Sequence, residues 1–310
     1  MLAIDSDPFQ LHVHKLNHLE ARHVLLELGD DLAEFVRKIQ IFVRAAVPEG
    51  EVWHLHASPP CQGFSKAGGR TVRNRDGKRC LTAWTASLIE ALDPPSWSLE
   101  NVPPCLAYLK ANCACLLSMD GVRVFQNAFG WEHGAPVLRK RLLIGKGFDL
   151  SKRIYEREED VGLRRFLPYL EANMHVKNEV TNRWMWNKVT KRREKGRRWR
   201  PEQGELMRSV DRPTYTPRAS NRNQIWQEVE KGTFRSVRIL TVREVSVIQG
   251  FPADYVIPER MKEAVAVFYT DVEGEEKIKI KVRPTKGTLT TGFGNSVCPP
   301  ITRAMLSTTH

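Results

Sequence analysis

The sequence has no apolar run approaching the roughly 20 residues that a membrane-spanning helix needs. The residues after Met1 also lack the basic segment and apolar core of a secretory signal. Its 6 cysteines in 310 residues are too few and too irregularly spaced for a disulfide scaffold. We therefore expect an intracellular protein with no membrane association, from the cytoplasm of a prokaryote or a virus-infected cell, or from a nucleus.

Metal-binding patterns are also missing. Cys113 and Cys115 form a single C-x-C with no second ligand pair near them. Structural zinc sites take paired ligands at defined spacings, so ordinary packing explains these cysteines better. We expect no metal site.

Acidic residues are fewer than basic ones, with 36 Asp and Glu against 48 Lys and Arg, a formal net charge of +12. A surplus of this size favours a polyanionic partner. The basic residues concentrate at 183–200, RWMWNKVTKRREKGRRWR, where tryptophans lie among them. Phosphates attract cations and bases stack on aromatic rings, but a solvated charged loop explains the stretch equally well. The candidate phosphate contacts are Arg192, Arg193, Arg197 and Arg198.

The first half of the chain alternates between strand and helix patterns. The spacing predicts strands at 2–4, 52–57, 97–99, 122–128 and 141–145, and helices at 9–17, 31–46 and 81–92. This rhythm is typical of a wound α/β sheet, in which functional groups collect at the carboxyl ends of strands. Cys61 and Glu100 each follow a predicted strand end.

The middle of the chain has a different composition. Residues 151–236 are rich in Arg, Lys, Trp and Asn, and their apolar periodicity is weak. They predict a smaller, irregular domain, while residues 1–150 and 237–310 form the larger lobe. A helix is predicted from Val237 to Gln249, and the KIKIKV run at 277–282 predicts an added hairpin.

The strongest chemical signal is the segment Ser58-Pro59-Pro60-Cys61-Gln62-Gly63-Phe64-Ser65. Prolines stiffen the turn and hold the thiol at a fixed point, and Gly63 lets a substrate approach the backbone. A thiolate held in this way can act as a nucleophile, although an isolated cysteine is more often a packed core residue. Two further segments favour the nucleophile: Glu100-Asn101-Val102, and the alternating Arg139 and Arg141 that lead into a strand.

In this order the segments resemble the motifs of the C5-cytosine-specific DNA methyltransferases. P-C-Q with F-S, E-N-V, and R-x-R running into L-L-I-G are followed by two further blocks. Residues 238–255 are similar to the family's R-x-L-T-x-R-E…Q-x-F-P-x-x-Y block, and residues 294–299 to its G-N-S-V-x-P block. The resemblance implies an α/β class of fold, a Rossmann-like class I S-adenosylmethionine-dependent methyltransferase sheet with a smaller target-recognition domain. Double-stranded DNA would lie in the cleft between the two.

The resemblance also implies roles for individual residues. Cys61 would attack C6 of a cytosine extruded from the duplex, while Glu100 would hold the N3/N4 edge of that base. Arg141, with Arg139 beside it, would fix the base and support the loaded cysteine. Further contacts to DNA would come from Gln62, Ser65 and Asn101. S-adenosylmethionine would be bound by Asp5, by Asp30 or Asp31, and by Pro60, Asn295 and Ser296.

The sequence departs from the family pattern in three places. No F-x-G-x-G-G cofactor loop precedes Leu2, Val137 stands where the family usually has Gln, and the stretch 257–291 is long. We expect either that a separate N-terminal fragment supplies the strand and glycine loop, or that the chain binds the cofactor weakly. The chain would otherwise be monomeric. An RNA (tRNA) cytosine-5 methyltransferase and a catalytically impaired DNA-binding relative remain alternatives.

Overall fold

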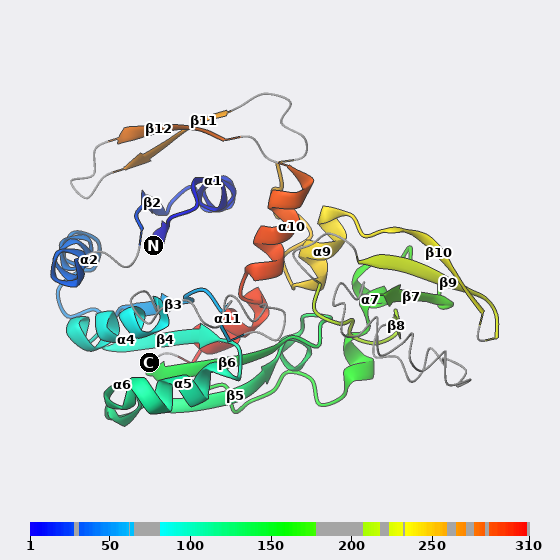
Figure 1. Ribbon diagram of the computed structural model, residues 1–310, viewed down its shortest axis with the longest axis horizontal. Coiled ribbons are helices and arrows are strands. Elements are labelled where there is room, and N and C mark those ends of the chain that lie inside the picture. The colour runs from blue at the N-terminus through cyan, green and yellow to red at the C-terminus, as the bar shows by residue number, and fades with distance from the viewer. Residues whose placement is uncertain are drawn as a thin grey trace.

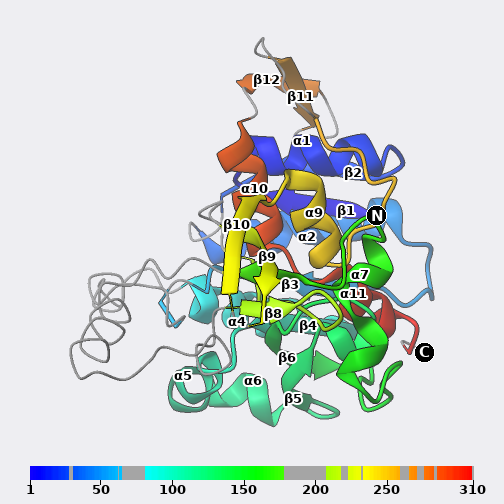
Figure 2. The same ribbon diagram turned by 90° about the vertical axis from the view of Figure 1, so that its right-hand side faces the viewer.

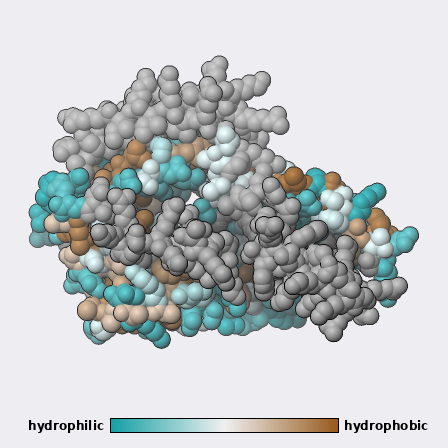
Figure 3. Space-filling view, viewed as in Figure 1, coloured by the Kyte–Doolittle hydropathy of each residue, from teal (hydrophilic) through white to brown (hydrophobic). Residues whose placement is uncertain are grey.

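The computed structural model describes ten stretches of the chain: 1–27, 31–61, 63–64, 81–177, 207–217, 223–231, 233–258, 265–270, 276–282 and 285–308. Within them, alternating strands and helices build a mixed α/β fold (Figure 1). On the face in Figure 3, hydrophilic and hydrophobic residues are interspersed over the described surface. No described helix is both long and apolar enough to cross a membrane.

The N-terminal strand pair is parallel. β1 (Leu2–Asp5) and β2 (Arg22–Leu25) pair with Leu2 opposite Arg22, and α1 (Pro8–Asn17) connects them. The Asp7 carboxylate caps α1 by accepting a hydrogen bond of 2.8 Å from the Phe9 amide, and Pro8 fits the first turn because that position needs no N–H donor. The next helix, α2 (Leu32–Ala46), begins in the same way at Asp31.

The main sheet has four strands in the order β3-β4-β6-β5. These are β3 (His54–Ala57), β4 (Ser96–Asn101), β6 (Lys140–Lys146) and β5 (Arg123–Phe129). β3 is parallel to β4, whereas β6 is antiparallel to both β4 and β5. All six residues of β4 are buried, as expected for a central strand. In both views the N-terminal pair lies beyond the β3 edge of this sheet (Figures 1 and 2).

Helices cover both faces of these strands. α2 and α4 (Leu81–Leu92) share one apolar cluster that includes Phe35, Ile39 and Leu88. α5 (Cys105–Asn112) and α6 (Ala114–Ser118) pack with β4 and β6 in a second cluster. The largest cluster joins α1 to α9 (Val242–Ile248), α10 (Lys286–Asn295) and α11 (Pro299–Leu306). Three apolar clusters therefore hold the helices against the strands.

A second sheet is antiparallel, with the order β10-β9-β7-β8. Its strands are β10 (Thr233–Ile239), β9 (Gln224–Glu230), β7 (Met174–Lys177) and β8 (Met207–Ser209), and α7 (Leu163–Phe166) lies beside it. Short 3-10 helices occur at Trp131–His133 and Glu158–Val161. The predicted domain limits at 151 and 236 stay a prediction, because the largest apolar cluster includes residues from both sides of each limit.

Two predicted elements have definite outcomes. The predicted helix from Val237 to Gln249 is wrong over its first residues, because β10 continues to Ile239 and α9 starts only at Val242. The predicted hairpin is present: β11 (Val265–Thr270) pairs antiparallel with β12 (Glu276–Val282).

Candidate active site

The ends of β3 and β4 place Cys61 and Glu100. The chain leaves β3 at Ala57 and turns through two prolines to Cys61, which is half-buried. Glu100 and Asn101 are the last two residues of β4 rather than the first residues beyond it. The Asn101 side-chain amide donates a 3.2 Å hydrogen bond to the Pro59 carbonyl. This bond ties the turn that carries the thiol to the end of the neighbouring strand.

Glu100 and Arg141 form an ion pair inside the protein. The Arg141 Nε faces Glu100 Oε1, and their side chains are only 10% and 6% exposed. The Ser58 hydroxyl donates a 2.8 Å hydrogen bond to the other carboxylate oxygen, Oε2. Breaking a buried pair by removing one partner typically costs about 3–5 kcal/mol, so the pair holds both side chains in place.

Arg139 is almost completely buried beside this pair. Its Nη1 donates to Gln249 Oε1 at 3.3 Å. Burial, and then the nearby Arg141 charge, lower the pKa of Arg139 to about 10, while Cys298, Glu100 and Cys61 act in the opposite direction. Arg139 therefore stays protonated at neutral pH, and it interacts electrostatically with Cys61.

Three residues at this site were given no role from the sequence. Ser58 binds Glu100, Gln249 binds Arg139, and the Cys298 thiol lies 3.6 Å from Gln249 Oε1. Burial raises the pKa of Cys298, which keeps it a neutral thiol. The motif blocks containing these residues were visible in the sequence, but their partners depend on the packing of α9 and α11 against the main sheet.

The candidate cofactor residues lie on three elements. Asp5 ends β1 and is exposed, and Asn295, also exposed, ends α10. A side chain at Gly292 would overlap Gln10 of α1, so α1 and α10 approach each other closely at that point. An exposed carboxylate offers acceptors for ribose hydroxyls, and an exposed amide offers a donor and an acceptor for an amino-acid group.

Asp5 Oδ1 already accepts a hydrogen bond of 2.9 Å from the Asp7 amide, and two other cofactor candidates also make hydrogen bonds within the protein. Asp31 caps α2, and its Oδ1 accepts from the amides of Ala33 (2.9 Å) and Glu34 (3.2 Å). The Ser296 hydroxyl donates to the Phe293 carbonyl at 2.8 Å, and Pro60 is exposed in the turn before Cys61.

Several predicted contacts lie outside the described residues: Asp30, Gln62, Ser65, Arg192, Arg193, Arg197 and Arg198. Among the residues that are described, no group of three or more His, Cys, Asp or Glu is arranged to hold a metal ion.

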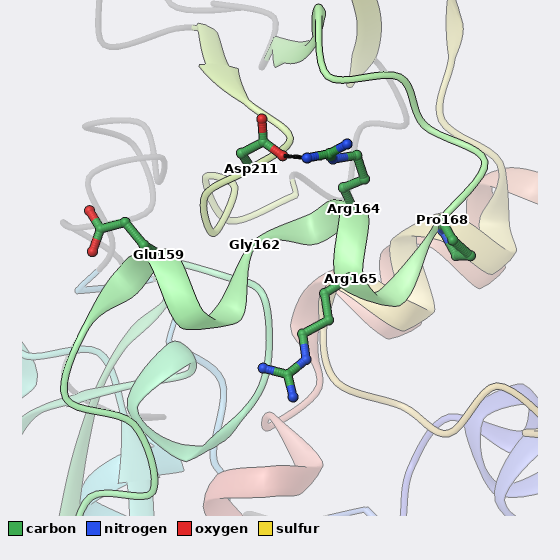
Figure 4. A pocket seen from close by; sticks show the side chains of 6 residues that line it. All are labelled: Glu159, Gly162, Arg164, Arg165, Pro168 and Asp211. Carbon is green, nitrogen blue, oxygen red and sulfur yellow. Dashed lines mark hydrogen bonds and ion pairs between the residues drawn. The ribbon is translucent and has the colours of Figure 1, made fainter.

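A separate shallow pocket of about 400 Å³ lies next to α7. Figure 4 shows the Arg164 guanidinium turned to Asp211, with 2.7 Å between Nε and Oδ1, whereas Arg165 points away from that pair. None of the side chains at the Cys61 turn or of the Glu100–Arg141 pair lines it. The chemistry of the site therefore belongs to the ends of β3 and β4 and not to this pocket.

A family model for the C-5 cytosine-specific DNA methylase matches residues 30–114, the segment that contains Cys61 and Glu100. Over this segment the chain resembles the C-5 cytosine-specific DNA methylases. No curated protein matches it in sequence.

Three of the solved structures that are similar to the chain come from different organisms. A methyltransferase from Entamoeba histolytica, EhMeth, has a TM-score of 0.58 at 14% identity over 99% of this chain and 88% of its own. The S. pombe Dnmt2 methyltransferase gives 0.52 at 15% identity, with 99% and 89% covered. A putative DNA modification methyltransferase from an E. coli prophage gives 0.50 at 17% identity, with 98% and 90% covered. The chain has the Rossmann-like α/β fold of these methyltransferases.

Proposed function

We propose that this C5 methylase relative transfers a methyl group to C5 of a cytosine in double-stranded DNA, through a covalent bond to Cys61. The observation that supports this most directly is the buried Glu100–Arg141 pair, with the exposed Ser58 bound to Glu100, beside the turn that carries Cys61. A carboxylate and a buried cation are paired there, and the turn that carries the thiol is tied to the end of the same strand through Asn101 and Pro59. A thiol, a carboxylate and a cation are the groups that attack on a pyrimidine ring requires.

The proposed chemistry begins at the thiolate. Cys61 Sγ forms a bond to C6, and the electrons of the C5–C6 double bond make C5 nucleophilic. Glu100 holds the N3/N4 edge and passes a proton to N3 as negative charge develops there, while Arg141 keeps the carboxylate fixed. S-adenosylmethionine, when bound, would supply the methyl group to C5 and would leave as the neutral thioether S-adenosylhomocysteine. Loss of the C5 proton to solvent then restores the C5–C6 double bond and releases Cys61 as a thiolate, and N3 returns its proton to Glu100.

The described residues fit S-adenosylmethionine in part. Asp5 would accept hydrogen bonds from the ribose hydroxyls, and Asn295 would lie near the methionine end with Ser296 beside it. In the same proposal Asp31 keeps its capping role, because its Oδ1 already accepts from two backbone amides of α2.

The experiment that tests the substrate uses the 310-residue chain with labelled methyl donor and, in separate reactions, duplex DNA and tRNA. Label in DNA supports the proposal. Label in tRNA alone would replace it with the RNA alternative, and DNA binding without any label would favour a catalytically impaired relative.

The experiment that tests the mechanism concerns Cys61. Cys61→Ser should abolish methyl transfer and leave the fold nearly intact, because it exchanges a single atom. A duplex with 5-fluorocytosine at the target should trap the wild type as a covalent adduct, since C5 then cannot lose a proton. Adduct formation by the serine variant would contradict the assignment, as would its absence from an active wild type.

A further inference from the structure

One face of β3 and β4 carries a row of polar side chains that the proposed reaction does not use. His54 and His56 on β3 lie opposite Ser96 and Ser98 on β4. His54 Nδ1 is 2.7 Å from the Ser96 hydroxyl, and His54 Nε2 is 2.8 Å from the Ser98 hydroxyl. His56 Nδ1 lies 2.8 Å from the same Ser98 oxygen. We call these four residues the histidine–serine ladder.

The positions of the protons in the ladder can be deduced by starting from Ser96. The Ser96 hydroxyl donates to the Lys146 carbonyl at 3.2 Å, so it must accept its second bond from the Nδ1–H of His54. Burial lowers the pKa of His54 to about 4, with a smaller contribution from His56, so this ring is neutral and its Nε2 carries a lone pair. Nε2 therefore accepts from the Ser98 hydroxyl.

The same reasoning fixes His56. Ser98 has one hydroxyl proton, already given to His54, so it accepts from the Nδ1–H of His56. His56 Nε2 then carries an unprotonated lone pair. This atom is screened from solvent and has no hydrogen-bond partner among the described residues. Burial lowers the pKa of His56, and the Glu100 carboxylate opposes this shift. The bond from the Ser98 hydroxyl to His54 Nε2 therefore requires a neutral His54 ring.

The ladder leads directly into the candidate site. Two residues beyond His56 and Ser98 on the two strands stand Ser58 and Glu100, which are joined by their own 2.8 Å bond. β3 is only four residues long, is half-buried along its whole length, and pairs with β4 alone among the described strands. Side-chain bonds across the pair therefore add to the backbone ladder and to the Asn101–Pro59 bond that fix β3, and the Cys61 turn, against β4.

We propose that His56 is a positioning residue of this site, which acts through Ser98 to hold the end of β3, and hence Cys61, in register with Glu100. This inference rests on the proposed function. The charged groups that face the ladder are Glu100 on β4 and, paired with it, Arg141 on β6; Phe148 packs edge-on against the His54 ring, with 6.3 Å between ring centroids. His56 itself does not touch the substrate in this proposal.

The test compares His56→Leu, His56→Asn and Ser98→Ala, with Ser118→Ala as a matched control outside the site. The Ser118 hydroxyl donates to the Cys115 carbonyl in its own helix. Because a small misplacement of a reacting group lowers the rate strongly, His56→Leu and Ser98→Ala should each lower kcat by roughly 10- to 100-fold with KM for the duplex little changed. Trapping by the 5-fluorocytosine duplex should slow in parallel.

Two comparisons separate positioning from simple stability. In His56→Asn the side-chain amide can donate to Ser98 from the place of Nδ1–H, so kcat should return close to the wild-type value. The double variant of His56→Leu with Ser98→Ala should be no slower than the slower single variant, because both break the same bond. If His56→Leu does not fold, Ser98→Ala, which removes one atom, carries the test.

The outcomes are distinct. Unchanged kcat in Ser98→Ala, or an asparagine variant as slow as the leucine variant, would overturn the role of His56 while Cys61→Ser remains inactive. Methyl transfer by Cys61→Ser would overturn the proposed function itself, whatever the His56 variants do.

Discussion

Buried neutral histidines are a feature of this protein at the scale of single residues. Burial lowers the pKa of His12, His14, His23, His56 and His133. The pKa of His14 falls to about 4, through burial first and then through the neighbouring His18 and His23 rings. Its Nδ1 lies 2.8 Å from His23 Nε2, and its ring centroid is 4.3 Å from that of His18. A cluster of this kind favours a folded state that binds fewer protons than the unfolded chain.

We expect the free energy of unfolding to fall as the pH is lowered. The folded pKa of His14 lies below its unfolded value of 6.5, so its contribution is complete above pH 6.5 and is lost as the pH falls towards about 4. His14→Gln should reduce the slope in this range by a screened fraction of the roughly 1.4 kcal/mol per pH unit that one proton contributes. Urea unfolding at several pH values measures how the free energy of unfolding changes with pH. The same slope in the variant would show that His14 is not responsible.

The sequence singled out candidate residues for the chemistry but not the residues that contact them. Glu100 and Arg141 were singled out from their motifs, and the structure brings them together as a buried pair. Ser58 could not be chosen as the partner of Glu100, because the register of β3 on β4 decides which side chains lie opposite each other. A shift of one residue in a strand would turn each side chain to the other face.

At the scale of elements, the start of α9 shows how a helix is set by its cap. The Thr241 hydroxyl accepts from the Glu244 amide at 3.1 Å, and the Glu244 carboxylate accepts from the Thr241 amide at 2.7 Å. Glu244 also accepts from Arg238 of β10 and from the Tyr169 hydroxyl. The cap therefore ends β10, starts α9 and links both to the loop before β7.

Thr241→Ala should destabilise the protein by about 1 kcal/mol, the usual cost of losing an N-cap hydroxyl. For a chain of this size the melting temperature should fall by roughly 2 °C. Thr241→Ser keeps the hydroxyl and is the matched control. Differential scanning calorimetry of the wild type and the two variants measures the change in melting temperature. An alanine variant as stable as the serine variant would contradict the role of the cap.

This cap also explains the misplaced helix. The T-x-x-E pattern at Thr241 and Glu244 is a helix-start signature that was available in the sequence. The apolar residues Val237 and Ile239 fit either a strand or a helix, and pairing with β9 made them a strand. The elements of the first half were easier to predict, because the apolar residues of its long helices recur at helical spacing.

At the scale of the whole molecule, the apolar cores join segments that are distant in the chain. Phe9 of α1, Val176 of β7 and Met305 of α11 belong to one cluster. A sequence shows that such residues are apolar but not that they meet, so the fold class could be predicted from the sequence and the domain limits at 151 and 236 stay a prediction. The net charge of +12 is also a property of the whole chain. Its effect on binding depends on where the basic residues lie.

The basic stretch at 183–200 gives a prediction for binding to DNA. Each cation that binds a phosphate releases condensed counterions, so the slope of log affinity against log salt counts the phosphates that the protein neutralises. Neutralising Arg192, Arg193, Arg197 and Arg198 together should weaken binding to duplex DNA. The slope should become shallower by about one unit for each phosphate that is no longer neutralised. Fluorescence anisotropy over a series of salt concentrations measures the slope.

The control neutralises four exposed basic residues elsewhere, namely Arg22, Arg37, Arg44 and Lys110. It changes the net charge by the same amount, so a general electrostatic effect would lower both slopes equally. If the 183–200 stretch binds the phosphates directly, only the first variant changes the slope, because distant surface charges are screened beyond about 10 Å at 0.1 M salt. Equal slopes in the two variants would mean that the stretch is a solvated loop and that the charge acts through the molecule as a whole.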